Sequence, residues 1–504
     1  KEPRQKKDLK PNKFDDAMED IMDIKSVQFR GDMLLSETQG RPKDHYSEHE
    51  EISAGALYSI KKVINKQSGC VRSMKEIKKA FIDLQEDEKN FMKEIAILRT
   101  LDHPYILKIY EFYQQEKYFY LITEFCKNGD LFDKINLMNS GFHEFTAAGI
   151  IYQLLSAIYY CNVVSILHRD IKAESILIES IDLININGEM VEKINIRLSD
   201  FSTARSYSES KNLTKKVGTS FYIAPEVLKR NYNKKCDVWS IGVLLYILLC
   251  GFVPFYGDTD KEIIQSIERG NLEMKPEEWK NISKEAKDLT ENLLKPDPMK
   301  RISIKDALKH SWFKLFPQLN ESVSLDVLSS LYKNISSFKT DPRYFFQQAT
   351  IAFMIHNIIK KEETVDIRKL FLYLDQKGDG RLLFKEITNG FKKCVGYNEK
   401  DILRVLKFID VNKGGNIEYQ EFLRVCLDKT KMLSEENLKS TFFLFAKDET
   451  KDYIPPSEFK SILGLQSKFS DSTWDEIIKT VDINGDNKIE YDEFKDMMLK
   501  FVKD

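Results

Sequence analysis

The sequence lacks long hydrophobic runs, paired cysteines and an excess of charge of either sign. Its longest apolar run, residues 241–255, is shorter than the ~20 residues that a membrane-spanning helix needs, so we expect a buried helix there. The seven cysteines show no C-x-x-C spacing, which favours reduced thiols in an intracellular protein. A formal net charge of −2 gives no reason to expect nucleic acid as a partner.

No signal peptide is visible at the start of the sequence. The chain begins at Lys1 without a methionine, so an upstream targeting or lipidation segment could have been removed. We therefore expect a monomeric, cytoplasmic protein that reaches a membrane only through an N-terminal segment absent from this sequence.

The 504 residues are too many for one ordinary domain. Residues 1–45 are polar and form an N-terminal extension. Residues 46–315 begin with short β-like runs and end in helical patterns, which indicates two lobes with a cleft between them. Residues 316–362 have apolar positions at helical spacing, and residues 363–504 repeat acidic loops between amphipathic helices about every 35 residues, which marks a separate helical domain.

Five short motifs occur in a fixed order in the second segment. They are Lys61 after Tyr-Ser-Ile, Glu94 in a helical pattern, Leu167-His-Arg-Asp170, Ser199-Asp-Phe-Ser202 and Ala224-Pro-Glu226. A single His-Arg-Asp occurs by chance, but the ordered set does not. Residues 50 to 315 resemble the protein-kinase family, which predicts an α+β, bilobal kinase fold followed by an all-α EF-hand domain.

The resemblance implies roles for these side chains, because kinases work mainly by positioning and by neutralising phosphate charge. Lys61, held by Glu94, would grip the ATP phosphates. Asp170 would accept the proton of the substrate hydroxyl, and Lys172 follows the pattern of kinases that act on Ser or Thr. The remaining residues expected to bind ATP or its Mg²⁺ are Glu124 and Cys126 in the hinge, Asp130, Ser175 and Asp200.

Two further pairs of residues match kinase positions. Asp130 and Glu174 resemble acidic residues that contact ribose or basic substrate side chains, so we expect protein substrates with basic residues near the target hydroxyl. Glu226 and Arg301 match a buried ion pair that holds the large lobe together.

Three features depart from the kinase pattern. No G-x-G-x-x-G precedes Lys61, which leaves too few residues for the hairpin that should cover the phosphates, and we expect that the sequence omits part of it. Ser175 replaces the Asn that binds a second Mg²⁺, and a hydroxyl is a weaker ligand. Ser202 replaces the Gly of Asp-Phe-Gly, whose backbone is freer. A pseudokinase that acts as a scaffold or binding switch therefore remains an alternative, as does a Ca²⁺ buffer.

The acidic loops have the spacing of EF-hands, which offer Ca²⁺ oxygens at positions 1, 3, 5, 7, 9 and 12. The fourth loop, 482–493, is the most complete. The first has Lys377 at position 3 and the second has Gly414 at position 5, so each lacks one ligand. The expected Ca²⁺ ligands, with position 7 acting through its carbonyl, are Asp375, Asp379, Arg381 and Glu386, then Asp410, Asn412, Asn416 and Glu421, then Asp482, Asn484, Asp486, Lys488 and Glu493.

The third loop, 447–458, has lysines at positions 1 and 5, and we expect it to bind no ion. All four loops carry an apolar residue at position 8. We expect these residues to pair as short antiparallel strands, Leu382 with Ile417 and Ile454 with Ile489.

The order of kinase, helical segment and four EF-hands resembles the calcium-dependent protein kinases of plants and protists. The resemblance implies a Ca²⁺-regulated Ser/Thr kinase that uses ATP and Mg²⁺, with residues 316–362 as one autoinhibitory junction helix.

Overall fold

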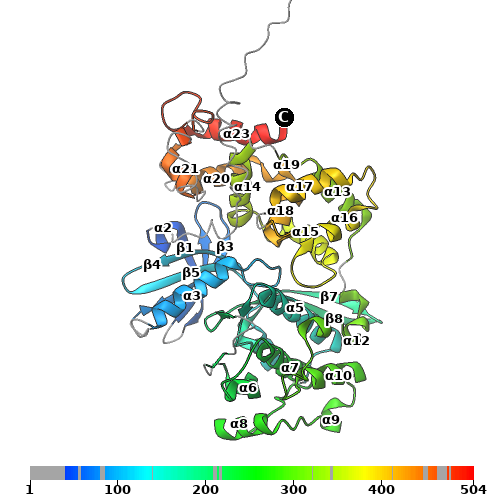
Figure 1. Ribbon diagram of the computed structural model, residues 1–504. Helices are drawn as coiled ribbons and strands as arrows, with labels where there is room; N and C mark the ends of the chain where they lie inside the picture. Colours follow the sequence, from blue (N-terminus) through cyan, green and yellow to red (C-terminus); the bar gives the residue numbers. More distant parts are fainter. Residues whose placement is uncertain are drawn as a thin grey trace, which may run out of the picture.

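The computed structural model describes residues 40–503, except 55–57, 80–85, 139, 208–212, 215–217, 320–321, 341–343, 411–412, 447–451, 463–473 and 476–477. Figure 1 shows a sheet-rich small lobe, a mainly helical large lobe and a helical module beside both lobes. The fold is α+β, as predicted.

The small lobe is a five-stranded antiparallel sheet in the order β1-β2-β3-β5-β4 with one long helix. Because β3 lies at the centre of this order, its side chains are flanked by strands on both sides. The elements are α2 (Pro42–His45), β1 (Tyr46–Ala54), β2 (Tyr58–Asn65), β3 (Val71–Lys78), α3 (Glu86–Thr100), β4 (Ile109–Gln114) and β5 (Tyr118–Glu124).

The large lobe is built around α5 (Glu144–Val163) and α7 (Lys235–Cys250), which are buried over most of their length. The apolar run 241–255 thus includes the end of a core helix, as expected, and α7 stops at Gly251, whose φ of 83° suits glycine. The other helices are α4 (Leu131–Asn136), α6 (Pro225–Leu228), α8 (Asp260–Arg269), α9 (Pro276–Trp279), α10 (Lys284–Leu293), α11 (Ile304–Ala307) and α12 (Ser311–Lys314), with 3₁₀ turns η4 (Ala173–Ser175), η5 (Ser220–Tyr222) and η6 (Pro317–Leu319).

Two small sheets shape the active face of the large lobe. The strand β6 (Ile166–Leu167) pairs with β9 (Arg205–Ser206), and β7 (Ile176–Ile186) forms a long hairpin with β8 (Glu189–Leu198). The catalytic segment lies between β6 and β7, so both of its ends are fixed by strands.

The junction contains two helices, α13 (Leu325–Ser336) and α14 (Phe345–Asn357), so the prediction of one continuous helix is wrong. Pro342 lies between them, and proline disfavours a helical conformation in the preceding residue. Apolar side chains of both helices, such as Leu331, Ile335 and Ile351, share one core with the EF-hand helices. The junction is therefore packed into the EF-hand module.

The EF-hand module is built of short helices that flank the predicted calcium loops. Its elements are α15 (Lys361–Leu374), β10 (Leu382–Leu383), α16 (Phe384–Phe391), α17 (Glu399–Ile409), β11 (Asn416–Ile417), α18 (Tyr419–Cys426), α19 (Lys429–Met432), α20 (Glu435–Ala446), β12 (Tyr453–Ile454), α21 (Pro456–Ile462), β13 (Ile489–Glu490) and α23 (Tyr491–Lys503). Leu382 pairs with Ile417 and Ile454 with Ile489, which confirms the predicted pairing.

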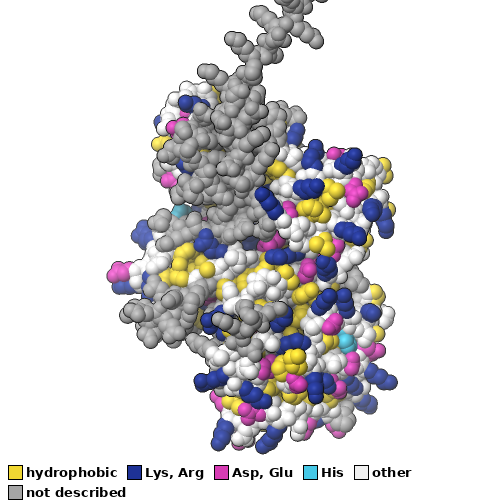
Figure 2. Space-filling view, in the orientation of Figure 1, with side chains coloured by type: hydrophobic (Ala, Val, Ile, Leu, Met, Phe, Trp, Pro, Cys, Tyr) yellow, Lys and Arg dark blue, Asp and Glu magenta, His cyan; other side chains and the backbone are white. Residues whose placement is uncertain are grey.

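The described surface carries mixed charge. Lysine and arginine side chains alternate with acidic ones over the lobes and the module on the face shown in Figure 2. Within the described ranges, no helix combines the length and the apolar character needed to cross a membrane.

Candidate active site and calcium loops

Asp170 is held in a fixed position between two loops. Its Oδ2 lies 2.7 Å from Lys172 Nζ, and its Oδ1 accepts hydrogen bonds from the Thr219 amide at 3.0 Å and the Thr219 hydroxyl at 2.9 Å. Asp237, buried near the start of α7, accepts bonds from the amides of His168 and Arg169. The segment before Asp170 is thereby anchored to the core, and Asp170 lines a small hollow together with Thr219 and Tyr222.

The predicted pairing of Lys61 with Glu94 is wrong, because Lys75 and not Lys61 lies near Glu94. Lys61 lies on β2, where its Nζ pairs with Glu48 at 3.1 Å and Glu76 at 3.4 Å. Lys75 lies on β3, and its charge acts on both Glu94 and Asp200. It therefore has the neighbours that the sequence assigned to Lys61.

The two carboxylates near Lys75 respond differently to their surroundings. Burial raises the pKa of Glu94 to about 7, although the charge of Lys75 opposes this shift. Burial also raises the pKa of Asp200, but Lys75 and a hydrogen bond from Ser202 outweigh it, so that this pKa is lowered. Asp200 is thus kept ionised, as a metal ligand must be.

Two paired strands precede the strand of Lys75, so the residues that seemed too few before Lys61 are present before Lys75. With Lys75 as the reference, β1 and β2 form the hairpin, and Ser53, Gly55 and Tyr58 occupy the three glycine positions of G-x-G-x-x-G. Residues 55–57 lie outside the described part. The Tyr58 ring lies 5.0 Å from the Lys75 ammonium, so a tyrosine at the last glycine position packs on Lys75.

Both predicted serine replacements make local hydrogen bonds. The Ser175 hydroxyl is fully buried, donates to the Lys172 carbonyl at 2.8 Å and accepts from the Lys172 amide at 3.1 Å. The Ser202 hydroxyl donates to Asp200 Oδ1 at 2.7 Å. Positive φ is found at Asp200, with 60°, and not at Ser202, so the serine causes no left-handed strain in this conformation.

The hinge residues play different parts. Glu124 ends β5, and its side chain is buried against Arg197 at 2.7 Å and Lys361 at 2.9 Å, so this carboxylate is not free to contact a nucleotide. Burial raises the pKa of Cys126 to about 12, which keeps this thiol neutral. Asp130 caps α4 by accepting the Asp133 amide at 2.9 Å.

The buried ion pair of the large lobe is confirmed. Arg301 donates to both carboxylate oxygens of Glu226, at 2.5 and 2.9 Å. Such a bidentate pair is directional, and it ties the segment after Thr219 to the helical base of the lobe.

A second buried ionic network was missed by the sequence analysis. Glu179 on β7 contacts Arg197 on β8, Lys361 at 3.4 Å and Arg368 at 2.6 Å. Lys361 and Arg368 belong to α15, so this cluster joins the hinge to the EF-hand module. No local pattern marks these residues, because the contact of Glu179 with Arg368 spans 189 positions in sequence and depends on the docking of two domains.

The first and fourth calcium loops show the internal bonding of EF-hands. Asp375 accepts amide hydrogen bonds from Gly378, Asp379 and Gly380, and Asp482 does the same with Gly485, Asp486 and Asn487. In the fourth loop Asp486 accepts a hydrogen bond from the Lys488 amide. Glu493 accepts hydrogen bonds from the amides of Ile483, Asn484 and Glu490.

The other expected ligands are placed as follows. Asp379 accepts the Arg381 amide, Glu386 the Leu383 amide, Asp410 the Gly414 and Gly415 amides, and Glu421 the Glu418 amide. Asn416 lies in β11. Asn412 and much of the third loop lie outside the described residues.

The donor set of these loops suits a hard, oxygen-seeking cation. Carboxylates at positions 1 and 12 bracket the first, second and fourth loops, with amide or carbonyl oxygens between them. In the described ranges, no three His, Cys, Asp or Glu side chains converge closely enough to enclose a metal ion; the carboxylates accept bonds from loop amides instead. Lys377 is near enough to act on Asp379 and Glu386, in agreement with a weakened first loop.

Comparison with known proteins supports this site. A protein kinase domain matches residues 46–313, and an EF-hand domain pair matches residues 450–500. Calcium-dependent protein kinase 4 of Plasmodium berghei is 33% identical over 487 residues, which cover 94% of this chain and 90% of that protein. Calcium-dependent protein kinase 19 of Arabidopsis thaliana is 31% identical over 465 residues, 91% of this chain and 82% of that protein. The chain belongs to the calcium-dependent protein kinases.

This calcium-dependent protein kinase is a Ca²⁺-regulated Ser/Thr kinase that uses ATP and a divalent metal and acts on proteins. The matches do not support the pseudokinase alternative. Glu94 and Asp200 lie near each other, as the sequence suggested, but the lysine beside them is Lys75 and not Lys61. The sequence analysis missed Lys75, although the shortage of residues before Lys61 was a signal to look further along the chain.

Proposed function

We propose that this kinase transfers the γ-phosphate of Mg·ATP to serine or threonine, with Lys75 and Asp200 on the phosphates and Asp170 on the substrate hydroxyl. The observation that carries the proposal is the placement of Lys75 within the electrostatic reach of both Glu94 and Asp200. Mg²⁺ supplies Lewis-acid charge when bound. Asp200 would be its chief protein ligand, and Ser175 a weaker one.

The metal preference is tested by Ser175→Asn in a phosphotransfer assay over a series of Mg²⁺ concentrations. Asparagine would restore a longer oxygen ligand, so activity should rise or the Mg²⁺ requirement should fall. If neither quantity changes, the buried serine hydroxyl already meets the need or the second metal is not used.

We propose further that the substrates carry basic residues near the target hydroxyl. Asp130 and Glu174 are close enough for the charge of Glu174 to raise the pKa of Asp130, an effect secondary to burial. Two neighbouring carboxylates favour an arginine or lysine ligand. Peptides with and without arginine upstream of the same serine test this, and equal kcat/KM values would contradict it.

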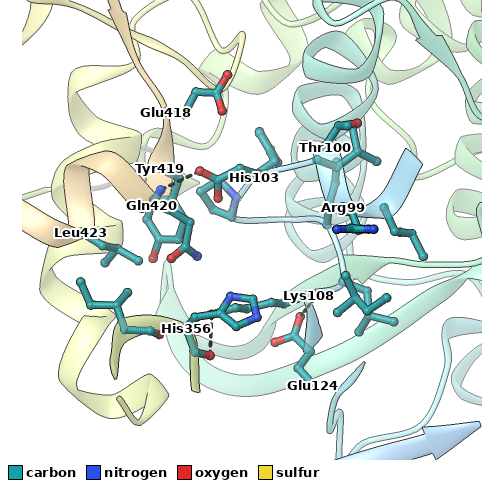
Figure 3. Close-up of a pocket in the computed structure, with 18 of the residues that line it drawn as sticks. Arg99, Thr100, His103, Lys108, Glu124, His356, Glu418, Tyr419, Gln420 and Leu423 are labelled. Carbon is teal, nitrogen blue, oxygen red and sulfur yellow. Dashed lines mark hydrogen bonds between the residues drawn. The ribbon is translucent and has the colours of Figure 1, made fainter. Parts of the chain in front are cut away.

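Ca²⁺ control would act through the junction. In this structure α13 and α14 share the core of the EF-hand module. At the C-terminal end of α14, backbone carbonyls accept hydrogen bonds from Arg72 and Lys108 of the small lobe, the latter shown in Figure 3. A ligand shifts an equilibrium only by its differential affinity for two states. We propose that without Ca²⁺ the junction obstructs the substrate cleft, with Lys333, Lys339 or Arg343 imitating a basic substrate; Arg343 lies outside the described residues.

We also propose that fewer than four Ca²⁺ bind per chain, because the third loop offers lysines in place of ligands. Glu493→Gln should weaken binding most, since it changes the bidentate position of the most complete loop. Calorimetry that finds four comparable sites would contradict this stoichiometry.

We propose that the protein is a cytoplasmic monomer. The support is its near-neutral charge and free cysteines. Light scattering of the purified chain and fractionation of cells that express it test these points, and a stable dimer would contradict the monomeric state.

A further inference from the structure

Tyr58 begins β2, at the position of the last glycine in the loop that covers the ATP phosphates in kinases. Glycine serves at such a position because it has no side chain and lets the backbone come close to a ligand. A tyrosine puts one of the largest side chains there. The direction of its ring therefore decides what the substitution does to nucleotide binding.

The register of the sheet sets that direction. Tyr58 pairs with Ile77, and Ile60 pairs with Lys75. Residues two apart on a strand point to the same face, and residues directly opposite each other in an antiparallel pair share a face. Tyr58 and Lys75 are thus diagonal neighbours on one face, which is within reach of an aromatic side chain.

The ring uses this reach to contact the lysine. The Lys75 ammonium lies 5.0 Å from the centre of the Tyr58 ring, and a cation over an aromatic face is attracted to it. The charge of the same ammonium acts on Glu94 and Asp200. The ring therefore lies on the cation that we have proposed as the phosphate ligand.

The ring is not enclosed by a core. Tyr58 is 38% exposed, so its neighbours leave the side chain room to turn aside. A charge-assisted hydrogen bond from an ammonium to a phosphate oxygen is stronger than an exposed contact with a ring. Phosphates can therefore displace the ring from Lys75, at a cost in affinity.

We propose that Tyr58 determines how strongly this kinase binds the phosphates of its nucleotide, because its ring competes with them for the Lys75 ammonium. The proposal rests on the role of Lys75 in the proposed function. A nucleotide with phosphates must displace the ring, whereas a nucleoside need not. Tyr58 thus lowers the preference of the site for ATP and ADP over adenosine.

Calorimetric titration of the full chain with saturating Ca²⁺ and excess Mg²⁺ tests this, with ADP and adenosine as the probes. Tyr58→Gly should bind ADP about two- to fivefold more tightly, the factor expected for loss of an exposed cation–π contact. Its affinity for adenosine should equal that of the wild type.

Three further variants identify the cause. Tyr58→Phe keeps the ring and should bind ADP as the wild type does. Tyr58→Leu keeps an apolar side chain without a ring and should bind ADP more tightly. Ser59→Gly is the control for backbone freedom, because it adds a glycine next to Tyr58 on the opposite face of the strand, and it should change neither affinity.

Steady-state phosphotransfer separates this role from a general loosening of the strand. In Tyr58→Gly the KM for ATP should fall by the same two- to fivefold, while kcat stays unchanged. This pattern follows because the ring acts on nucleotide binding and not on the transition state alone.

Three results would overturn the proposal: ADP binding to Tyr58→Gly that is equal to or weaker than that of the wild type, an equal gain in affinity for adenosine, or the same gain in Ser59→Gly. Failure of the proposed function looks different. A wild-type chain that binds ADP but transfers no phosphate would contradict the kinase activity, whereas an active chain with unaltered ADP binding in Tyr58→Gly would contradict only the role of Tyr58.

Discussion

Lys75 and Lys61 offer a matched pair of substitutions, because both are lysines on neighbouring strands that meet different carboxylates. Lys75→Met should lower kcat about 100-fold or more, since it removes a preorganised cation from the phosphates. Lys61→Met removes a partly exposed pair with Glu48 and Glu76 and should leave kcat within about threefold of the wild type, because such pairs contribute little. Steady-state phosphotransfer measures both. The reverse order of effects would reinstate Lys61.

Ser202 tests how the metal ligand is tuned. Its hydroxyl occupies one oxygen of Asp200, and such a bond contributes about 0.5–1.5 kcal/mol. Ser202→Ala should free that oxygen and lower the Mg²⁺ concentration for half-maximal activity by about two- to tenfold. Ser202→Gly should do the same and add backbone freedom. An unchanged Mg²⁺ requirement in both variants would show that metal binding already displaces the hydroxyl.

The two lysines also show where sequence reasoning reached its limit at the scale of residues. The residues before Lys61 and before Lys75 both form β-like patterns that end in lysine. Only the carboxylates that each lysine meets in the folded protein distinguish the two. Asp170, Asp200 and Glu226 were predictable because each lies in a motif with several fixed neighbours. The buried bonds of Ser175 and the ring of Tyr58 beside Lys75 follow from packing, which a local pattern does not encode.

The paired loops carry a prediction at the scale of elements. Ile454 of the third loop pairs with Ile489 of the fourth, and both are fully buried. Ile454→Ala should cost about 2–5 kcal/mol of packing and weaken Ca²⁺ binding by the fourth loop about tenfold, even though we propose that the third loop itself binds no ion. Ile417→Ala, in the other pair, should leave the fourth loop unchanged. Calorimetric titration distinguishes them, and equal effects of the two substitutions on the fourth loop would refute the coupling.

The contact of α15 with the hinge carries a second prediction. Glu179 and Arg368 are 2.6 Å apart and largely buried, so their coupling should be about 0.5–3 kcal/mol. Arg368→Met should raise the Ca²⁺ concentration for half-maximal activity, whereas Lys369→Met, exposed on the same helix, should not.

A double-mutant cycle with Glu179→Gln isolates the pair. If the effects of Glu179→Gln and Arg368→Met on the activation midpoint simply add, this contact does not hold the module to the hinge.

The elements were predictable to different degrees. The pairing of Leu382 with Ile417 followed from loop length, because position 8 is fixed within twelve residues. The division of the junction into α13 and α14 was not predicted, although Pro342 signalled it. The packing of both helices into the EF-hand core depends on surfaces that lie far apart in sequence, and periodicity alone shows only that some partner must cover them.

At the scale of the whole molecule, α14 meets the small lobe through Arg72 and Lys108, and the first calcium loop meets α5 through Ser156. Gly378 accepts a hydrogen bond from Ser156, and a Cβ at Gly380 would overlap the ring of His103. The first calcium loop therefore contacts the kinase directly. Its conformation and the docking of the module should change together, which gives Ca²⁺ a path to the kinase that does not pass through the junction alone.

Removal of the junction and module tests the form of control. A chain that ends after residue 319 keeps the core of the kinase, including Leu319, and loses α13 and all EF-hands. It should phosphorylate peptides without Ca²⁺ at a rate similar to that of the Ca²⁺-loaded full chain. An inactive truncated chain beside an active full chain would mean that the docked module braces the kinase, and simple inhibition would be the wrong description.

The most direct test of the account is the initial rate of phosphate transfer from Mg·ATP to a basic serine peptide by the full chain, with Ca²⁺ and with a Ca²⁺ chelator. The account predicts a rate that rises at least about tenfold with Ca²⁺, since an allosteric coupling is typically 1–3 kcal/mol, and no transfer by Asp170→Asn in either condition. A rate that is the same with and without Ca²⁺, or equal in the wild type and Asp170→Asn, would contradict it.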